Sequence, residues 1–181
     1  MRLLFLTLVA LLAPLNANAC PAASTTLVAP INIVDVAHGV VQPARGLVFS
    51  GGRIAQEFDA RRIENVRREH PGAAEVDGGN AFAIPGLWDM HVHTLWDEQV
   101  PVAFFAAFLS NGVTSVRDMG GDLNIALRTR AQIAACTLEA PNLWFPGPFL
   151  DGPHPVDPTL SIALTTPDQG RDAVRRLEED E

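Results

Sequence analysis

The sequence contains no lysine and no tyrosine. All 13 of its basic residues are arginines, and they stand against 21 acidic residues for a net charge of −8. The missing lysine excludes any mechanism that needs a lysine side chain. The acidic balance argues against a nucleic-acid groove or an anionic membrane surface as the main partner, because both favour clustered positive charge.

Cysteine is also scarce, with Cys20 and Cys136 alone. Two cysteines allow at most one disulfide and match no zinc-finger spacing. Cys136 falls in an alanine-rich stretch predicted to be helical, where we expect a buried thiol that packs as a small hydrophobic side chain. With 181 residues, the chain is also too short for a complete eight-stranded α/β barrel, which needs about 250.

The first 19 residues have the pattern of a secretory signal peptide. Arg2 supplies a positive start, residues 3–15 form an uncharged apolar run, and residues 17–19 read Ala-Asn-Ala, which a signal peptidase accepts. A transmembrane anchor is the alternative, but spanning a bilayer takes about 20 apolar residues. We therefore expect a secreted or periplasmic protein that begins at Cys20 and meets a membrane only if that cysteine is lipidated.

Residues 20–84 are predicted to form a small N-terminal β-domain, arranged as a β-sandwich layer. Gly51-Gly52 between two short apolar segments is typical of a hairpin turn. The charged stretch 60–69 shows little apolar periodicity, so we expect it to be a solvated excursion. The predicted strands are 31–36, 46–50, 53–56, 73–76 and 81–84.

Residues 85–181 show a different rhythm, in which predicted strands alternate with predicted helices. The strands are expected at 87–93, 113–116 and 142–149, and the helices at 100–110, at 122–137 and from Thr166 onward. A threonine followed by Pro167 and then by Gln169 is a helix start with a capping box. Three strand–helix units in this length predict an α/β fold that amounts to about three-eighths of a (β/α)8 TIM-type barrel.

The strongest chemical signal is the pair His91 and His93 at the end of the first predicted strand of this region. Side chains alternate along a strand, so both imidazoles are expected on one face, with Cα atoms about 6.6 Å apart. Two imidazoles at this separation can bind one zinc ion. A bare His-x-His on a strand also occurs by chance, so the surrounding residues carry the argument further.

Three segments around these histidines, 84–93, 112–121 and 147–153, resemble the amidohydrolase superfamily, in particular its imidazolonepropionase-like and prolidase-like branch. Segments 33–35 and 52–54 are similar to the small β-domain that precedes the barrel in that family. The resemblance implies that His91 and His93 are the first two ligands of a site for one or two divalent metal ions, with zinc expected. It also implies a small-molecule or dipeptide-like substrate, whose amide, lactam or other C–N bond is attacked by a metal-activated water.

The same resemblance implies further ligands that this sequence lacks. Such enzymes commonly carry a carboxylated lysine or a glutamate on the fourth barrel strand, histidines on the fifth and sixth, and an aspartate on the eighth. We therefore expect an N-terminal portion of a longer exported hydrolase, inactive alone and with no catalytic residue of its own. The alternative is a non-catalytic remnant or interaction module that retained the His-x-His motif.

Other candidates are expected to matter less. His154 follows the third predicted strand and is expected to be a solvated loop residue or to face substrate. Arg117 and Asp118 end the second strand, where they either shape the pocket or pair with each other. His38 and His70 fall in turns with no expected role. The tryptophans are expected in core or rim packing: Trp88, Trp96 and Trp144.

Overall fold

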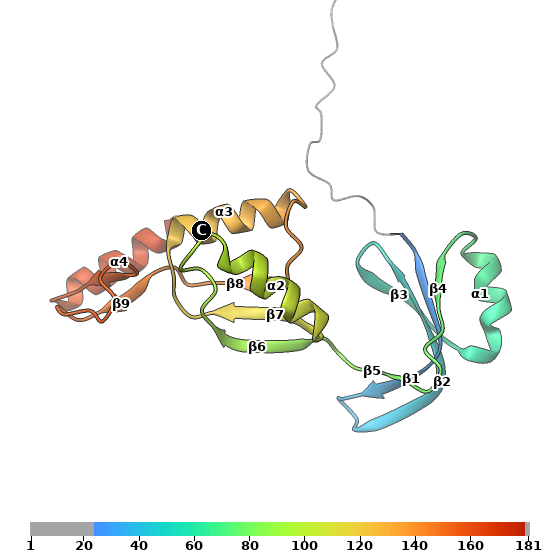
Figure 1. Cartoon of the computed structure of the whole chain (residues 1–181). Helices are drawn as coiled ribbons and strands as arrows, with labels where there is room; N and C mark the ends of the chain where they lie inside the picture. The colour runs from blue at the N-terminus through green and yellow to red at the C-terminus, as the bar shows by residue number, and fades with distance from the viewer. Residues whose placement is uncertain (1–23, 180–181) are drawn as a thin grey trace, which may run out of the picture.

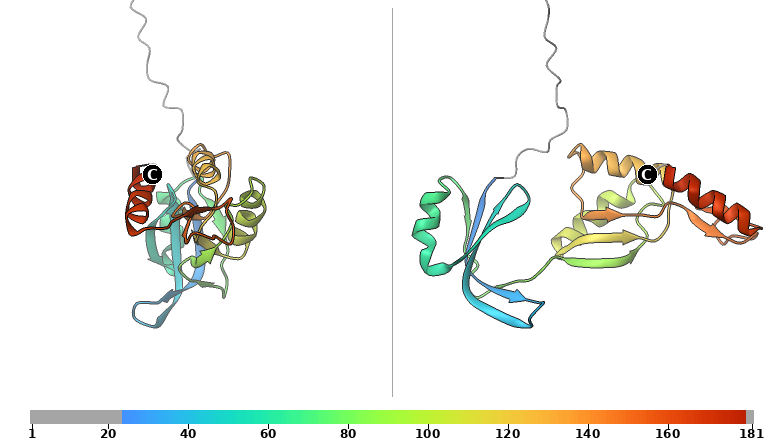
Figure 2. Two further views of the ribbon diagram at one scale, coloured as in Figure 1. Left: turned by 90° about the vertical axis from the view of Figure 1, so that its left-hand side faces the viewer. Right: turned by 180° about the vertical axis from the view of Figure 1, so that it is seen from behind.

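The structure is a computed structural model that describes residues 24–179, and the predicted signal peptide and Cys20 lie outside these residues. Figure 1 shows two parts, an N-terminal sheet with one helix and a C-terminal α/β part, joined by the segment between β5 and β6. The right-hand view of Figure 2 shows the same two parts from behind. No helix of residues 24–179 has both the length and the apolar content needed to cross a membrane.

The N-terminal part is one five-stranded sheet. Its strands are β1 (Thr26–Asp35), β2 (Val40–Ser50), β3 (Arg53–Asp59), β4 (Ala74–Val76) and β5 (Phe82–Ala83). The order is β3-β2-β1-β4, and β5 pairs with the far end of β1. The first three strands are antiparallel neighbours, whereas β4 and β5 run parallel to β1. The described residues therefore form a single sheet layer here, and the predicted β-sandwich is not found among them.

The predicted hairpin at Gly51-Gly52 is confirmed. Strands β2 and β3 pair antiparallel across these two glycines, which have φ angles of 58° and 72°. Both angles lie in the left-handed region, where a side chain is strained and glycine is not. These two glycines therefore determine the turn locally, as two turn residues between two short apolar segments predict.

The stretch 60–69, predicted to be a solvated excursion, is instead a 3-10 turn (Ala60–Arg62) followed by helix α1 (Ile63–Glu69). Its single fully buried residue, Val66, packs with Leu27, Val48 and Phe58 of the sheet. Ile63 of α1 is partly buried against the same cluster, so two apolar side chains hold this helix on the sheet. Two apolar positions are too few to show a helical period in the sequence, so the helix was not predicted. The expected solvation of the stretch agrees with its mostly exposed side chains.

The C-terminal part contains a three-stranded parallel sheet with helices between its strands. The strands β6 (Leu87–Val92), β7 (Val113–Asp118) and β8 (Asn142–Trp144) lie in the order β6-β7-β8. Helix α2 (Val100–Ser110) connects the first two, and α3 (Leu123–Ala134) connects the second and third. Consecutive parallel strands with helical crossovers confirm the predicted α/β organisation of this region.

Two buried groups hold this unit together. Leu95, Ile125 and Ala126 form a core cluster against which Leu143 and Phe145 pack, so α3 is fixed to the sheet. Phe105 of α2 and Val116 of β7 are fully buried as well. The side chain of Asp122 caps α3 by accepting a hydrogen bond from the backbone N–H of Ile125 at 3.0 Å.

The third predicted strand, 142–149, is divided in the structure. Strand β8 ends at Trp144, and β9 (Phe149–Asp151) pairs with β10 (Ser161–Ala163) in a separate two-stranded sheet. Pro146 and Pro148 lie in the gap, where their missing N–H groups end the pairing. Strand β10 was not predicted.

Helix α4 (Pro167–Glu179) begins with the predicted capping box. The Gln169 side chain accepts hydrogen bonds from the N–H groups of Thr165 and Thr166, and the Gln169 N–H donates to the Thr166 hydroxyl.

The prediction that Cys136 is a buried thiol inside a helix was wrong. This residue lies just beyond α3, is exposed, has a φ of 58° and is disulfide-bonded.

Candidate metal-ligand pair

The two motif histidines lie at the carboxyl end of β6, next to the carboxyl end of β7. His91 belongs to the strand and His93 follows its last residue. Parallel pairing brings Val92 of β6 opposite Asp118, the last residue of β7. The carboxyl ends of parallel strands form the edge at which open and barrel-type α/β folds carry their ligand sites.

The imidazoles of His91 and His93 lie next to each other, with ring centres 5.2 Å apart and planes at 71°. Two imidazoles bound tetrahedrally to one zinc ion, with Zn–N bonds of ~2.1 Å, would have their ring centres about 5 Å apart. The neutral nitrogen donors and their spacing therefore fit two ligands of such an ion. Within residues 24–179, no group of three or more histidine, cysteine or acidic side chains is arranged to hold a metal.

The strand that carries the pair is irregular. Its pairing with β7 shifts between Asp89 and Val92, so β6 gains a residue relative to its neighbour. The side chain of Asp89 accepts a hydrogen bond from the backbone N–H of His91 at 3.1 Å inside this irregularity. Bulges of this kind redirect side chains at sheet edges and near active sites. The simple alternation used for the prediction is thus broken here, although the two rings still lie together.

His93 is held on two sides by residues that sequence reasoning did not identify. Its Nδ1 lies 3.2 Å from the carbonyl oxygen of Gly120, and its ring centre lies 5.6 Å from that of Phe149. A carbonyl can only accept a hydrogen bond, so this contact requires the hydrogen on Nδ1. The unprotonated Nε2 is then the nitrogen available to a metal ion.

Asp118 supports this arrangement through hydrogen bonds to Thr94, the residue after His93, and to Gly120. Its buried carboxylate accepts hydrogen bonds from the Thr94 N–H at 2.6 Å, the Thr94 hydroxyl at 3.0 Å and the Gly120 N–H at 3.0 Å. It therefore ties the residue after His93 to the glycine that contacts His93. The predicted alternative, a pair with Arg117, is not formed: the Arg117 side chain is exposed, whereas the Asp118 carboxylate is buried and bonds to Thr94 and Gly120.

The other histidines lie elsewhere. His38 is exposed and contacts the Asp35 carboxylate at 2.7 Å, and this hydrogen bond lowers the pKa of Asp35. His70 lies 3.3 Å from the side-chain oxygen of Gln56. His154 is exposed in the loop between β9 and β10, as expected for a solvated loop residue.

The tryptophans are not core residues, which leaves the other expectation, packing at the rim. Trp88 and Trp144, on the two outer strands of the parallel sheet, contact each other with ring centres 6.4 Å apart. Both are more than half exposed, as is Trp96. Core packing of these side chains is therefore not observed within residues 24–179. Trp88 and Trp144 are half-exposed aromatic side chains that line one cavity together with Arg130 and Ile133 of α3.

Two cavities bear on the interpretation of the site. One of about 660 Å³ lies between the β9 region and α4, and its mainly apolar lining includes Met119 and Phe149. Phe149 thus contacts His93 and also lines this cavity. Phe149 is therefore the residue that connects this cavity with the histidine pair.

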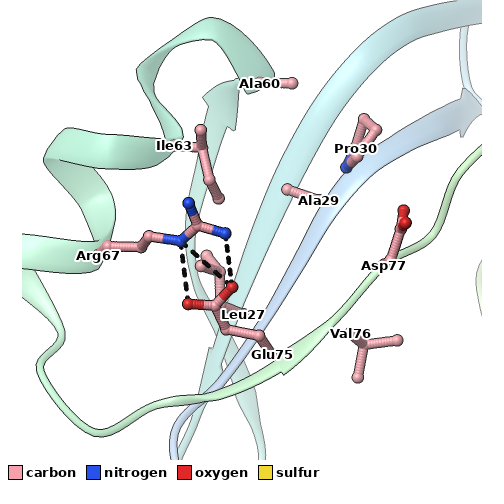
Figure 3. Close-up of a pocket in the computed structure, with 9 residues that line it drawn as sticks. All are labelled: Leu27, Ala29, Pro30, Ala60, Ile63, Arg67, Glu75, Val76 and Asp77. Carbon is pink, nitrogen blue, oxygen red and sulfur yellow. Dashed lines mark hydrogen bonds and ion pairs between the residues drawn. The ribbon is translucent and has the colours of Figure 1, made fainter.

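The other cavity, of about 490 Å³, lies between α1 and the N-terminal sheet and is shown in Figure 3. Across it, the guanidinium of Arg67 forms hydrogen bonds with the Glu75 carboxylate at 2.7 to 3.2 Å. These bonds lower the pKa of Glu75 and raise that of Arg67. The ion pair is satisfied without a ligand, and the cavity contains neither motif histidine.

The chain resembles known proteins over part of their length. No family model matches the chain. Adenine deaminase 2 of Agrobacterium fabrum is 33% identical over 85 residues, which is 46% of this chain and 13% of that protein. Among solved structures, a protein described as a prolidase from Bifidobacterium longum matches with a TM-score of 0.73 and 25% identity, over 88% of this chain and 39% of that one.

An amidohydrolase structure matches with a TM-score of 0.66 and 21% identity, over 86% of this chain and 44% of that one. The chain therefore spans less than half the length of these proteins. The predicted resemblance to the amidohydrolase superfamily is confirmed, and the part of the fold that is shared is consistent with its N-terminal portion. These matched proteins are described as an adenine deaminase, a prolidase and an amidohydrolase.

Proposed function

We propose that this chain is the N-terminal portion of an exported, metal-dependent amidohydrolase that cleaves a C–N bond in a small-molecule or dipeptide-like substrate. The observation that carries the proposal is the adjacent pair of imidazoles, 5.2 Å apart, at the carboxyl edge of a parallel sheet. The similarity to a prolidase-type structure and to an adenine deaminase supports the bond type.

The proposed fold is the first part of a (β/α)8 barrel, over residues 85–181, preceded by a β-domain over residues 20–84. Its support is the parallel order β6-β7-β8 with helical crossovers. The exposed pair Trp88 and Trp144 fits this proposal, since further strands would cover an open sheet surface of this kind. The missing strands would also bring the remaining ligands and the group that handles the proton.

A divalent metal ion, for which we propose zinc, supplies Lewis acidity and lowers the pKa of a bound water. His91 and His93 contribute nitrogen ligands from one strand end. The Gly120 carbonyl holds the His93 ring in one orientation, and Phe149 shields its other side. The neighbouring cavity, lined by Met119 and Phe149, offers an apolar wall to a substrate side chain.

Export is proposed from the signal-like residues 1–19, which the structure does not describe. The disulfide bond of Cys136 supports it, because structural disulfides persist in oxidising compartments and are rare in the cytosol. We propose no nucleic-acid partner, and contact with a membrane only if Cys20 carries a lipid.

Hydrolysis by two forms of the protein tests this function. The 181-residue chain is expected to show no turnover of an amide, lactam and dipeptide panel, because two histidines fall short of the three protein ligands of a catalytic zinc site. A polypeptide extended by the remaining strands is expected to hydrolyse at least one C–N substrate and to lose that activity on chelation. Chelator-sensitive turnover by the 181-residue chain would contradict the claim that it is incomplete. No turnover and no bound metal in the extended form would favour the non-catalytic alternative.

A further inference from the structure

A continuous series of hydrogen bonds runs from the buried carboxylate of Asp118, through the peptide of Gly120, to Nδ1 of His93. Asp118 is 0% exposed and Thr94 is 1% exposed, so neither side chain can exchange its partners for water. One carboxylate oxygen of Asp118 accepts from Thr94 and the other accepts from the N–H of Gly120. The carbonyl of Gly120 in turn faces Nδ1 of His93.

The backbone at Gly120 has little freedom to move away from this position. Its φ is 137°, and a Cβ placed there would lie 2.4 Å from the Phe149 ring. Phe149 also packs against His93. The glycine peptide is therefore held between the Asp118 carboxylate, which accepts its N–H, and the Phe149 ring, which lies against its Cα.

We infer that Asp118 is a positioning residue, which holds the Gly120 carbonyl at Nδ1 of His93 and so presents Nε2 of that histidine as the metal-binding nitrogen. The inference rests on the proposed metal role of the histidine pair. A hydrogen bond to the second nitrogen of a metal-binding histidine selects its tautomer and ring orientation, and loss of such a partner typically weakens metal binding about 10- to 100-fold.

Asn in place of Asp118 is the sharpest variant, because it keeps the shape and loses one acceptor. The carboxylate accepts a backbone N–H on each of its two oxygens, from Thr94 and from Gly120. An amide has one oxygen, and its NH₂ group can only donate. Asp118→Asn must therefore break one of the two backbone contacts. Asp97→Asn is the matched control, since exposed Asp97 accepts the backbone N–H of Gln99 on one carboxylate oxygen, and an amide oxygen can accept the same bond.

The experiment records long-range ¹H–¹⁵N correlations of the histidine rings in the metal-free 181-residue chain, at a pH well above the ordinary histidine pKa of about 6.5. His93 is expected to be the Nδ1–H tautomer in the parent chain and in Asp97→Asn, and a mixture of tautomers in Asp118→Asn. If Asp118→Asn does not fold, Phe149→Leu removes the ring that holds Gly120 and is expected to give the same mixture. An Nε2–H tautomer in the parent chain, or an unchanged Nδ1–H tautomer in a folded variant, would overturn the inference.

Zinc affinity, measured by competition with a chromophoric chelator, separates this inference from the proposed function. Asp118→Asn is expected to weaken zinc binding about 10-fold or more, and Asp97→Asn is expected to leave it unchanged. If His91→Ala and His93→Ala leave zinc binding unchanged, the proposed metal role fails. The tautomer measurement is independent of that result, because it is made without metal.

Discussion

Phe58 lies so close to Gly46 that a Cβ on the glycine would come within 2.2 Å of the ring's Cζ atom. Gly46 belongs to β2 and Phe58 to β3, and the two are paired across the hairpin. Because Gly46 has no side chain, the Phe58 ring can lie over the Gly46 backbone. Phe58 thus packs in the core with Leu27, Val48 and Val66. This contact joins the hairpin to the helix that covers the sheet.

Gly46→Ala is therefore expected to destabilise the chain by about 1–3 kcal/mol, the usual cost of forcing extra volume into a packed site. The matched control is Gly152→Ala, since a Cβ on Gly152 meets nothing within 4 Å. Its effect is expected to stay within about 0.5 kcal/mol. Urea unfolding followed by circular dichroism measures both, and equal midpoints for the two variants would contradict the packing argument.

The local features of this fold could be predicted from the sequence where a specific backbone requirement marks them. Gly51-Gly52 fixes a hairpin, Asp122 and Gln169 cap helices, and the alternation after Pro85 produces parallel strands with helical crossovers. In each case a few neighbouring residues determine the outcome. The closeness of the two histidine rings was predicted as well, although the irregular pairing of β6 between Asp89 and Val92 was not.

Features that depend on one distant contact could not be predicted. Helix α1 is held by the fully buried Val66 and the partly buried Ile63, and two apolar positions leave no clear periodic pattern. Asp118 is buried because Thr94 and Gly120 satisfy its carboxylate, and those partners are known only from the fold. Phe149 meets His93 across 56 positions of sequence, so no local signal connects them.

Stability is expected to fall in acid partly through Glu75. Hydrogen bonds from Arg67 lower the pKa of Glu75 in the folded chain, so its contribution is present above the unfolded pKa of about 4.3 and is lost as the pH falls through the lower folded value. In Arg67→Gln, less stability is expected to be lost between about pH 6 and pH 3 than in the parent chain. The difference is expected to be small, because solvent screens the pair.

The control for this measurement is Arg53→Gln, which removes an exposed arginine of β3 that forms no ion pair within residues 24–179. Urea midpoints across the pH range compare the parent chain with both variants. An acid-induced loss of the same size in Arg67→Gln and Arg53→Gln would show that the Arg67–Glu75 pair does not contribute.

The proposed export predicts the mass of the mature protein. The protein isolated from its native host is expected to begin at Cys20 and to contain no reactive thiol at Cys136, which is disulfide-bonded. Cys20 is the other cysteine of the sequence, and a lipid attached to its sulfur would prevent that sulfur from forming a disulfide. Intact-mass analysis before and after reduction distinguishes a two-hydrogen change from a lipid adduct. An intact Met1 would contradict export by this signal.

Zinc titration of the 181-residue chain against a chromophoric chelator shows whether His91 and His93 are two ligands of one metal ion. Weak one-to-one binding is expected, because two histidine ligands leave the remaining positions to water. His91→Ala and His93→Ala should each weaken it about tenfold or more, whereas His38→Ala and His70→Ala should leave it unchanged. Equal zinc affinity in the parent chain and in His91→Ala would contradict the metal role.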